Sequence, residues 1–253
     1  MDKRRINGPE ISVKPIEKKI TQTNSNDNEI RKNNRSIENI RPIFIKPNVI
    51  KKANGSAYYE AENIKVICGV YGPRSSKRSM VSDEGNIYCE FKFAPFSCNK
   101  RCGYIRNAQE REYSLIIQQA FLPAIRLNLY PKSTIDIYIT VLENDGTTAC
   151  LAAAITCASI ALTDAGIQMY DLVAAASATC IKGNICLDPD ASEEENDTNS
   201  KFMLSYMPSL KQITHVLCTG KMEAEQSIEA INTCIDACNS IKTVMDHCLI
   251  NSL

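Results

Sequence analysis

The strongest structural signal in this 253-residue chain is GSAYYEAENIKVICGVYGP, at residues 55–73. Apolar residues alternate along its second half, which is the period of a strand with one buried face. These residues are Ile64, Val66, Cys68 and Val70. A polar turn at Glu62 and Asn63 separates this run from an earlier extended run, and Pro73 ends it because proline lacks the amide that a strand ladder needs. The stretch therefore predicts a β-hairpin.

The sequence on both sides of the hairpin predicts more strands. Upstream, residues 43–50 predict an extended lead-in strand or an arm on a partner. Downstream, period-two alternation and β-branched content predict strands at residues 87–93, 134–142, 172–181, 185–187, 201–207 and 212–219. An acidic loop at residues 188–197 interrupts the later set.

Three segments have helical spacing. The first starts near Asn107 and is amphipathic, and Pro123 kinks or ends it because proline removes one intrahelical hydrogen bond. Residues 147–164 are apolar on all sides and precede Gly166 as a C-cap, so this helix must be buried between layers. Residues 222–249 form the last and longest helix.

Runs of strands capped by helices, without strict alternation, favour an α+β fold with a mixed sheet that carries helices. Residues 43–253 are predicted to form one domain, since no linker interrupts them. Residues 1–42 are predicted to be a disordered tail, because they are rich in Asn, Ser and Thr and lack a sustained apolar period.

The charges are balanced in total, at 29 basic and 29 acidic side chains, but unevenly distributed. Residues 1–50 hold 11 Lys and Arg against 6 Asp and Glu, a net charge of +5, which leaves −5 for the remainder. A basic tail can bind nucleic acid by releasing counterions, and it can equally be a solvated segment. No apolar run is long enough to span a membrane, and no signal peptide is expected.

The twelve cysteines are predicted to be reduced and mostly buried, as in a chain without a secretion signal. Cys234, Cys238 and Cys248 fall on the apolar stripe of the last helix, together with Ile228. The pair of Cys98 and Cys102 lies in a basic loop without a second pair to complete a zinc site, so no metal is expected.

Three separated motifs, in family order, resemble the RNase PH family. They are GSAYYEAENIKVICGVYGPR at residues 55–74, PKSTIDIYITVL at residues 131–142 with a following Asp-Gly, and LTDAGIQMYDLVAA at residues 162–175. The resemblance implies the fold of that family, a ribosomal protein S5 domain 2-like mixed sheet with packed helices.

Active members of this family trim RNA from its 3′ end with inorganic phosphate, and related subunits form the six-membered ring of the RNA exosome. Four shorter stretches resemble such a ring subunit. They are YGPRSSKR at residues 71–78, GIQMYDLV at residues 166–173, LDPDASEEE at residues 187–195 and YMPS at residues 206–209. The resemblance implies a hetero-hexameric ring with other RNase PH-like subunits, docking of cap subunits and contact with single-stranded RNA. It further implies a role in rRNA maturation and mRNA turnover in the nucleus, nucleolus and cytoplasm, with no cofactor and no membrane partner.

Phosphorolysis requires a cationic, donor-rich cradle for phosphate, to which arginine is well suited. In active relatives the turn after the strand at 134–142 reads GGTR, whereas this chain has DGTT at residues 145–148. Thr148 thus replaces a phosphate-binding Arg and Asp145 adds a negative charge, and the resemblance places Gln118 where active subunits carry a second Arg. Losing one preorganised donor costs about 10²- to 10³-fold in rate, so we expect these changes to abolish phosphorolysis.

The carboxylates, in contrast, favour a retained catalytic site. Active relatives carry a pattern close to LDLDYxED after a strand, and here Asp188 and Asp190 are followed by Glu193 and Glu194. Acidic groups therefore remain where the phosphate ligands are gone. The simplest interpretation is a solvated acidic loop, and the alternative is a metal site.

Two basic loops are candidates for contact with the RNA backbone. Arg74, Lys77 and Arg78 follow the first hairpin, and Lys100, Arg101 and Arg106 follow the strand at 87–93. The alternative is a surface that keeps the protein in solution.

The sequence thus predicts a ring subunit in which Asp188, Asp190, Thr148 and Gln118 are vestiges of a catalytic site. The alternative is an active phosphate-dependent 3′–5′ exoribonuclease, suggested by Asp188 and Asp190. A third possibility is a free RNA-binding protein that uses its basic tail.

Overall fold

The structure is a computed structural model that describes residues 35–75, 84–98, 101, 103, 105, 107–181, 183–194 and 200–252. All helices and strands belong to one compact unit, Ile37–Leu253. Most of the segment predicted to be a disordered tail lies outside the described residues. The compact unit begins six residues before the predicted domain start at residue 43, because Arg41 is 1% exposed and belongs to the core.

The first sheet has five strands in the order β1-β2-β3-β5-β4. The strands are β1 (Ile43–Pro47), β2 (Gly55–Ala61), β3 (Ile64–Ser75), β4 (Asn86–Phe93) and β5 (Ser133–Glu143). Strand β4 is parallel to β5 and all other pairs are antiparallel, so the sheet is mixed. The predicted hairpin is β2 and β3, and the predicted lead-in strand is β1.

The second sheet has four antiparallel strands in the order β7-β6-β8-β9. They are β6 (Ala174–Ile181), β7 (Asn184–Leu187), β8 (Ser200–Met207) and β9 (Gln212–Thr219). The sequence predicted these strands but not their separation into a sheet of their own.

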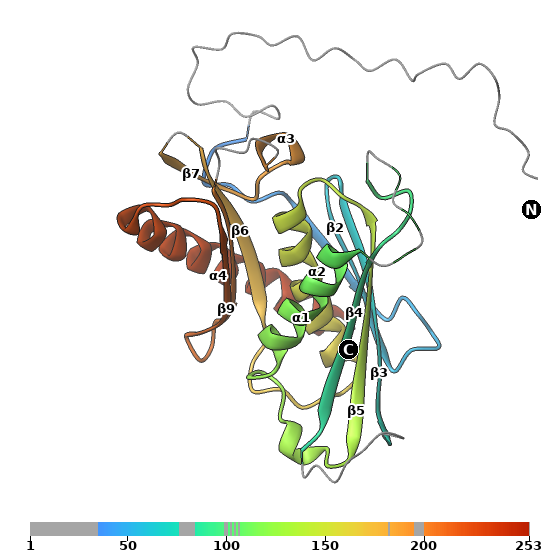
Figure 1. Ribbon diagram of the computed structural model, residues 1–253. Coiled ribbons are helices and arrows are strands. Elements are labelled where there is room, and N and C mark those ends of the chain that lie inside the picture. Colours follow the sequence, from blue (N-terminus) through green and yellow to red (C-terminus); the bar gives the residue numbers. More distant parts are fainter. Residues whose placement is uncertain are drawn as a thin grey trace, which may run out of the picture. The chain divides into compact units, whose positions relative to one another are not determined.

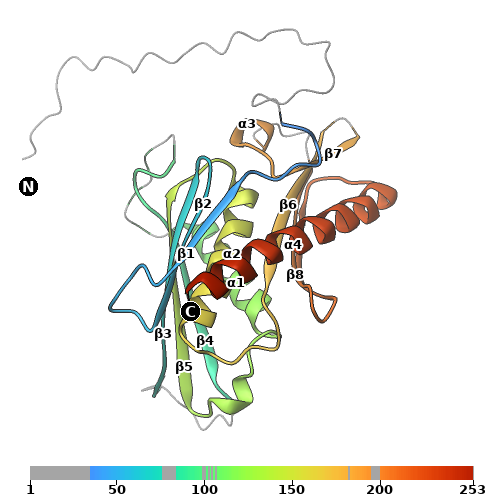
Figure 2. The ribbon, with the colours of Figure 1, turned by 180° about the vertical axis from the view of Figure 1, so that it is seen from behind.

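Helix α2 (Thr147–Asp164) lies between the two sheets and packs on β2, β3 and β6 (Figure 1). Helix α1 (Ala108–Phe121) packs beside it on β4, and α4 (Ala224–Ser252) packs on β6 and β1, as the reverse view shows (Figure 2). A 3₁₀ turn at Leu127–Leu129 and the short helix α3 (Ala191–Glu194) complete the described elements.

The central position of α2 explains its sequence. Fifteen of its residues, Thr148 to Leu162, are buried, and small side chains let both sheets approach it. The closest approach is at Gly55, where an added Cβ would lie 2.2 Å from the Ala165 nitrogen and 2.3 Å from the Ala161 oxygen. Gly166 follows with a φ of +69°, as the predicted C-cap requires.

Helix α1 begins and ends where its sequence predicts. The Asn107 amide donates to Glu110 Oε2 at 2.9 Å, and the other Glu110 oxygen accepts from the Phe93 amide at 2.9 Å. Glu110 therefore joins the helix start to the end of β4. The helix ends at Phe121, two residues before Pro123.

Two details differ from the prediction. Ile228 is 61% exposed and does not belong to the buried stripe of α4, whereas Cys234 and Cys238 are fully buried in it. The acidic loop contains α3, whose Glu194 is buried.

One helix in the described part of the chain, α2, has the length and composition of a membrane span. However, 83% of that helix is buried inside the folded unit, which is typical of a core helix.

Candidate functional site

Three segments that are distant in the sequence meet at the N-terminus of α2. They are the segment before β1, which carries Arg41, the turn between β5 and α2, which carries Asp145, and the turn after β7, which carries Asp188 and Asp190. The site therefore contains the acidic residues that the sequence singled out, together with an arginine from the predicted tail.

Arg41 and Asp188 form a two-pronged ion pair. Arg41 Nε donates to Asp188 Oδ2 at 2.8 Å and Nη2 donates to Oδ1 at 2.6 Å, while the Arg41 amide also donates to Oδ2 at 3.0 Å. This parallel arrangement is the strongest that guanidinium and carboxylate groups make. Asp188 is thus held by an internal partner.

The same guanidinium reaches two more carboxylates. Arg41 Nη1 lies 3.2 Å from Asp145 Oδ2 and 3.8 Å from Asp190 Oδ1, and Nη2 donates to the Pro189 carbonyl at 3.2 Å. Burial alone would lower the pKa of Arg41, but the hydrogen bonds and charge of Asp188, with the charges of Asp145 and Asp190, raise the pKa above its ordinary value. Arg41 is therefore a permanent cation among three anions.

Glu194 caps the N-terminus of α2. Its Oε2 accepts from the Thr147 amide at 2.6 Å and from Thr147 Oγ1 at 2.7 Å, and its Oε1 accepts from the Thr148 amide at 3.0 Å and from Thr148 Oγ1. The carboxylate is 3% exposed, and Lys201 Nζ lies 3.7 Å from it. These are the positive helix end and free amides that elsewhere bind phosphate.

Gly146 makes this contact possible. Its φ is +114°, and an added Cβ would lie 2.9 Å from the Pro189 oxygen and 3.0 Å from Glu194 Oε1. Only glycine allows this backbone angle and this close approach without strain. The turn between β5 and α2 is thus shaped to accept the segment 189–194.

The chemical consequence is that an internal carboxylate takes the position of an external anion. The four donors of Thr147 and Thr148 all serve Glu194, and the nearby Asp145, Asp188 and Asp190 would repel phosphate. Arg41 is the cation at the centre, and its guanidinium donates four hydrogen bonds to this chain's own oxygens.

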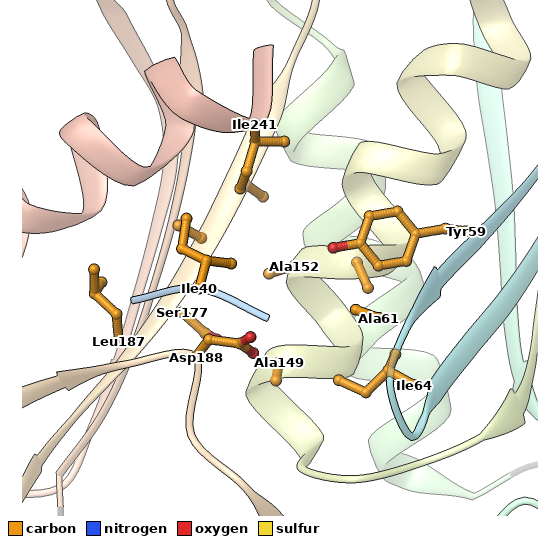
Figure 3. A pocket seen from close by; sticks show the side chains of 13 residues that line it. Ile40, Tyr59, Ala61, Ile64, Ala149, Ala152, Ser177, Leu187, Asp188 and Ile241 are labelled. Carbon is orange, nitrogen blue, oxygen red and sulfur yellow. The ribbon is translucent and has the colours of Figure 1, made fainter. Parts of the chain in front are cut away.

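A cavity of about 20 Å³ lies beside Asp188, between α2, β2 and α4 (Figure 3). The Tyr59 hydroxyl and the Asp188 carboxylate point toward it, and Ile40, Ala152 and Ile241 line it. Burial, together with the charge of Asp188, raises the pKa of Tyr59, so its hydroxyl stays protonated. The space suffices for about one water molecule and is too small for a nucleotide.

The structure does not bring Gln118 to this site. Tyr113, whose side chain contacts both Gln109 and Thr147, is the residue of α1 that faces the start of α2. Gln118 lies five residues further along, which is roughly 140° around the helix, and it is half-exposed. The contact between α1 and the start of α2 that the structure shows is that of Tyr113 with Thr147.

The two basic loops start from opposite ends of the first sheet. Arg74 pairs with Thr134 at the beginning of β5, whereas β4 ends at Phe93 opposite Val141, close to the turn that carries Asp145. The two ends are about 23 Å apart along the strand. Arg101 is exposed, and Lys77, Arg78, Lys100 and Arg106 lie outside the described residues.

The described residues contain no group of three metal-binding side chains with the geometry of a metal site. Cys98 is half-buried and accepts a hydrogen bond from Asn144 Nδ2 at 3.6 Å, while Cys102 lies outside the described residues. Asp188 and Asp190 share Arg41 as their counter-ion.

Sequence reasoning missed Arg41 and the capping role of Glu194. Arg41 was assigned to the tail, although Ile40 and Ile43 on either side of it are apolar and indicate an ordered segment. Glu194 occupies the position of the last acid in the LDLDYxED pattern. Its side chain is one methylene longer than aspartate, and no sequence rule indicated which helix it would cap.

Comparison with solved structures places this fold among exosome proteins. A crystal structure of rice (Oryza sativa) Rrp46 has a TM-score of 0.75 and 25% identity, and covers 85% of this chain and 98% of that one. An Archaeoglobus fulgidus exosome with RNA bound to the active site has a TM-score of 0.74 and 19% identity, and covers 86% of this chain and 92% of that one.

The sequence comparisons identify the family. Residues 39–168 match the model of the 3′ exoribonuclease family, domain 1 (RNase PH). The exosome complex component mtr3 of Schizosaccharomyces pombe is 36% identical over 98% of this chain and 96% of that protein, and MTR3 of Homo sapiens is 32% identical over 99% and 95%. An RRP41-like exosome complex component of Arabidopsis thaliana is 37% identical over 88% of this chain and 85% of its own length. The chain belongs to the RNase PH family of 3′ exoribonucleases.

Proposed function

We propose that this chain is a ring subunit of the eukaryotic RNA exosome without phosphorolytic activity of its own. It pairs with other RNase PH-like subunits, docks cap subunits and lines part of the RNA path in 3′–5′ processing and degradation. Similarity to exosome components over nearly the whole chain supports the assembly, and the nuclear, nucleolar and cytoplasmic sites of exosome action are proposed with it.

The position of Glu194 is the main support for the proposed lack of phosphorolytic activity. Its carboxylate occupies the amides and hydroxyls of Thr147 and Thr148, at the turn where active relatives present GGTR to phosphate. Arg41 holds Asp188 in the same site, which removes that carboxylate from proton or metal chemistry. Inorganic phosphate, the nucleophile, therefore finds its donors occupied by Glu194, and Asp188, the candidate activating carboxylate, is held by Arg41.

A direct assay tests this proposal. The full-length chain, alone and in its native complex, is incubated with single-stranded RNA and inorganic phosphate, and nucleoside diphosphates are measured. We expect the chain alone to release none, and we expect Asp188→Asn to leave any activity of the complex unchanged. Release of nucleoside diphosphates that stops on this isosteric change, with the melting temperature preserved, would instead establish the active phosphorolytic exoribonuclease.

Removal of the internal carboxylate should open the anion site. We expect Glu194→Ala to lower the free energy of unfolding by about 1–3 kcal/mol, because four donors at the α2 N-terminus lose their acceptor. Phosphate should then bind these donors and restore part of the loss, by about 1.4 kcal/mol at ten times its dissociation constant.

The measurement is a thermal melt with increasing phosphate, with chloride at equal ionic strength as reference. Glu193→Ala is the matched control, because the Glu193 carboxylate accepts from the Asp190 amide at 3.0 Å instead of the helix end. Wild-type protein and Glu193→Ala should show no specific phosphate effect. A wild-type chain that phosphate stabilises as strongly as Glu194→Ala would contradict the occupied site.

A tail deletion separates the ring subunit from the free RNA-binding protein. The deletion must end at residue 34, because Arg41 belongs to the folded unit. We expect the shortened chain to assemble into the complex. Loss of all RNA binding without loss of assembly would place RNA recognition in the tail.

A further inference from the structure

Three tyrosines lie together on the outer face of the first sheet. On β3, β4 and β5 the inward positions form the core, so Tyr71, Tyr88 and Tyr138 point to the opposite face. The Tyr138 ring lies 5.8 Å from Tyr71 and 6.4 Å from Tyr88, both edge to face. The described helices pack on the inner face of this sheet (Figure 1). Tyr88 and Tyr138 are 46% and 39% exposed.

Groups of both signs border this tyrosine platform. Asp136 and Glu90 lie beside Tyr138, and the cationic groups lie around them. The Arg74 guanidinium lies 4.9 Å from the centre of the Tyr71 ring, and its Nη1 lies 4.0 Å from Asp136 Oδ2. The loop between β1 and β2 packs over Gly69, where an added Cβ would be 3.4 Å from Ile50 Cδ1, and it carries exposed Lys51 and Lys52.

Exposed tyrosine rings together with neighbouring cations indicate which kind of molecule binds this face. Exposed aromatic rings on a sheet, next to arginine, are the means by which proteins stack unpaired bases, since every base has a π face. The cationic members of the border, Arg74, Lys51 and Lys52, complement a phosphodiester backbone.

We propose that Tyr71, Tyr88 and Tyr138, with Arg74, form a stacking platform for unpaired bases of single-stranded RNA. This inference rests on the proposed function, in which the chain contacts RNA, and it names the bases as the recognised chemistry. The platform lies on the outer face near the middle of β5, level with Asp136 and Tyr138, whereas the acidic site lies beyond the end of that strand. RNA held by the platform therefore lies on the outer face of the sheet and not at the α2 N-terminus.

Photo-crosslinking in the native complex tests the platform. Single-stranded RNA with 4-thiouridine is irradiated with the tagged full-length chain in its complex, and the modified peptides are mapped by mass spectrometry. We expect crosslinks within residues 64–75, 86–93 or 133–143. The double variant Tyr88→Leu and Tyr138→Leu should lose them and weaken RNA affinity by roughly fivefold or more, with an unchanged salt dependence because no charge is removed.

Two controls give the result its meaning. Tyr88→Phe combined with Tyr138→Phe keeps the rings and should retain the crosslinks. Tyr170→Leu removes an exposed tyrosine that also lies beside an arginine, with Arg126 at 4.9 Å from its ring centre, but that pairs with no other ring among the described residues, and it should have no effect.

The outcomes are distinguishable. Crosslinks on this chain only outside residues 64–75, 86–93 and 133–143 would overturn the platform and leave the proposed RNA contact intact. An absence of crosslinks anywhere on the chain would overturn both. Loss of a protein subunit from the leucine variant, with RNA affinity unchanged, would show that the face binds protein and would overturn the platform.

Discussion

Arg41→Ala should lower the free energy of unfolding by about 3–5 kcal/mol, the cost of leaving buried charges without their partner. The Arg41 side chain is fully buried, and its guanidinium is the shared cation of Asp145, Asp188 and Asp190. Its removal leaves three carboxylates close together with their compensating charge gone. Urea denaturation of the full-length chain, compared with wild type at equal salt, measures the loss.

Two variants separate this effect from a general loss of charge. Arg41→Lys retains the charge but cannot form the two-pronged contact with Asp188, so an intermediate loss is expected. Lys65→Ala removes an exposed ion pair with Glu143, whose Nζ–Oε2 distance is 2.8 Å, and should change stability little. If Arg41→Ala proved as mild as Lys65→Ala, the cluster would not hold this end of the fold together.

Gly55→Ala should be similarly severe for a different reason. The added Cβ would meet the backbone of Ala161 and Ala165 at 2.2–2.3 Å, and backbone atoms at the end of α2 cannot move aside as a side chain can. We expect a loss of about 3 kcal/mol or more in the free energy of unfolding, at the upper end of the range for overpacked cores. Equilibrium denaturation is again the measurement.

Gly69→Ala is the matched control, because its Cβ would lie 3.4 Å from the flexible end of Ile50. This is an ordinary van der Waals distance, so only a small change is expected. Equal losses in the two variants would mean that α2 does not press against the start of β2.

The strands and helices were largely predictable because each one depends on local periodicity. The alternation of Ile64, Val66 and Cys68 and the helix stop before Pro123 need no knowledge of distant residues. The division into two sheets depends instead on contacts of α2 with both of them, and no local pattern encodes such contacts.

The site was only half predictable for the same reason. Asp188, Asp190 and Thr148 could be identified from motifs, and the structure brings all three to one end of the molecule. Their partners could not, since Arg41 is 147 residues from Asp188 and Glu194 is 46 residues from Thr148. The role of Gln118 was inferred from the resemblance alone, and the residue of α1 whose side chain contacts Thr147 is Tyr113.

The distance in sequence between Arg41 and Asp188 has a consequence for biosynthesis. Arg41 leaves the ribosome 147 residues before its partner, which at about 5–20 residues per second is an interval of about 7–29 s. During that time the nascent chain carries a solvated arginine that later becomes fully buried. The carboxylates must come to a guanidinium already synthesised, so this end of the molecule closes late in translation, after most of the first sheet has emerged.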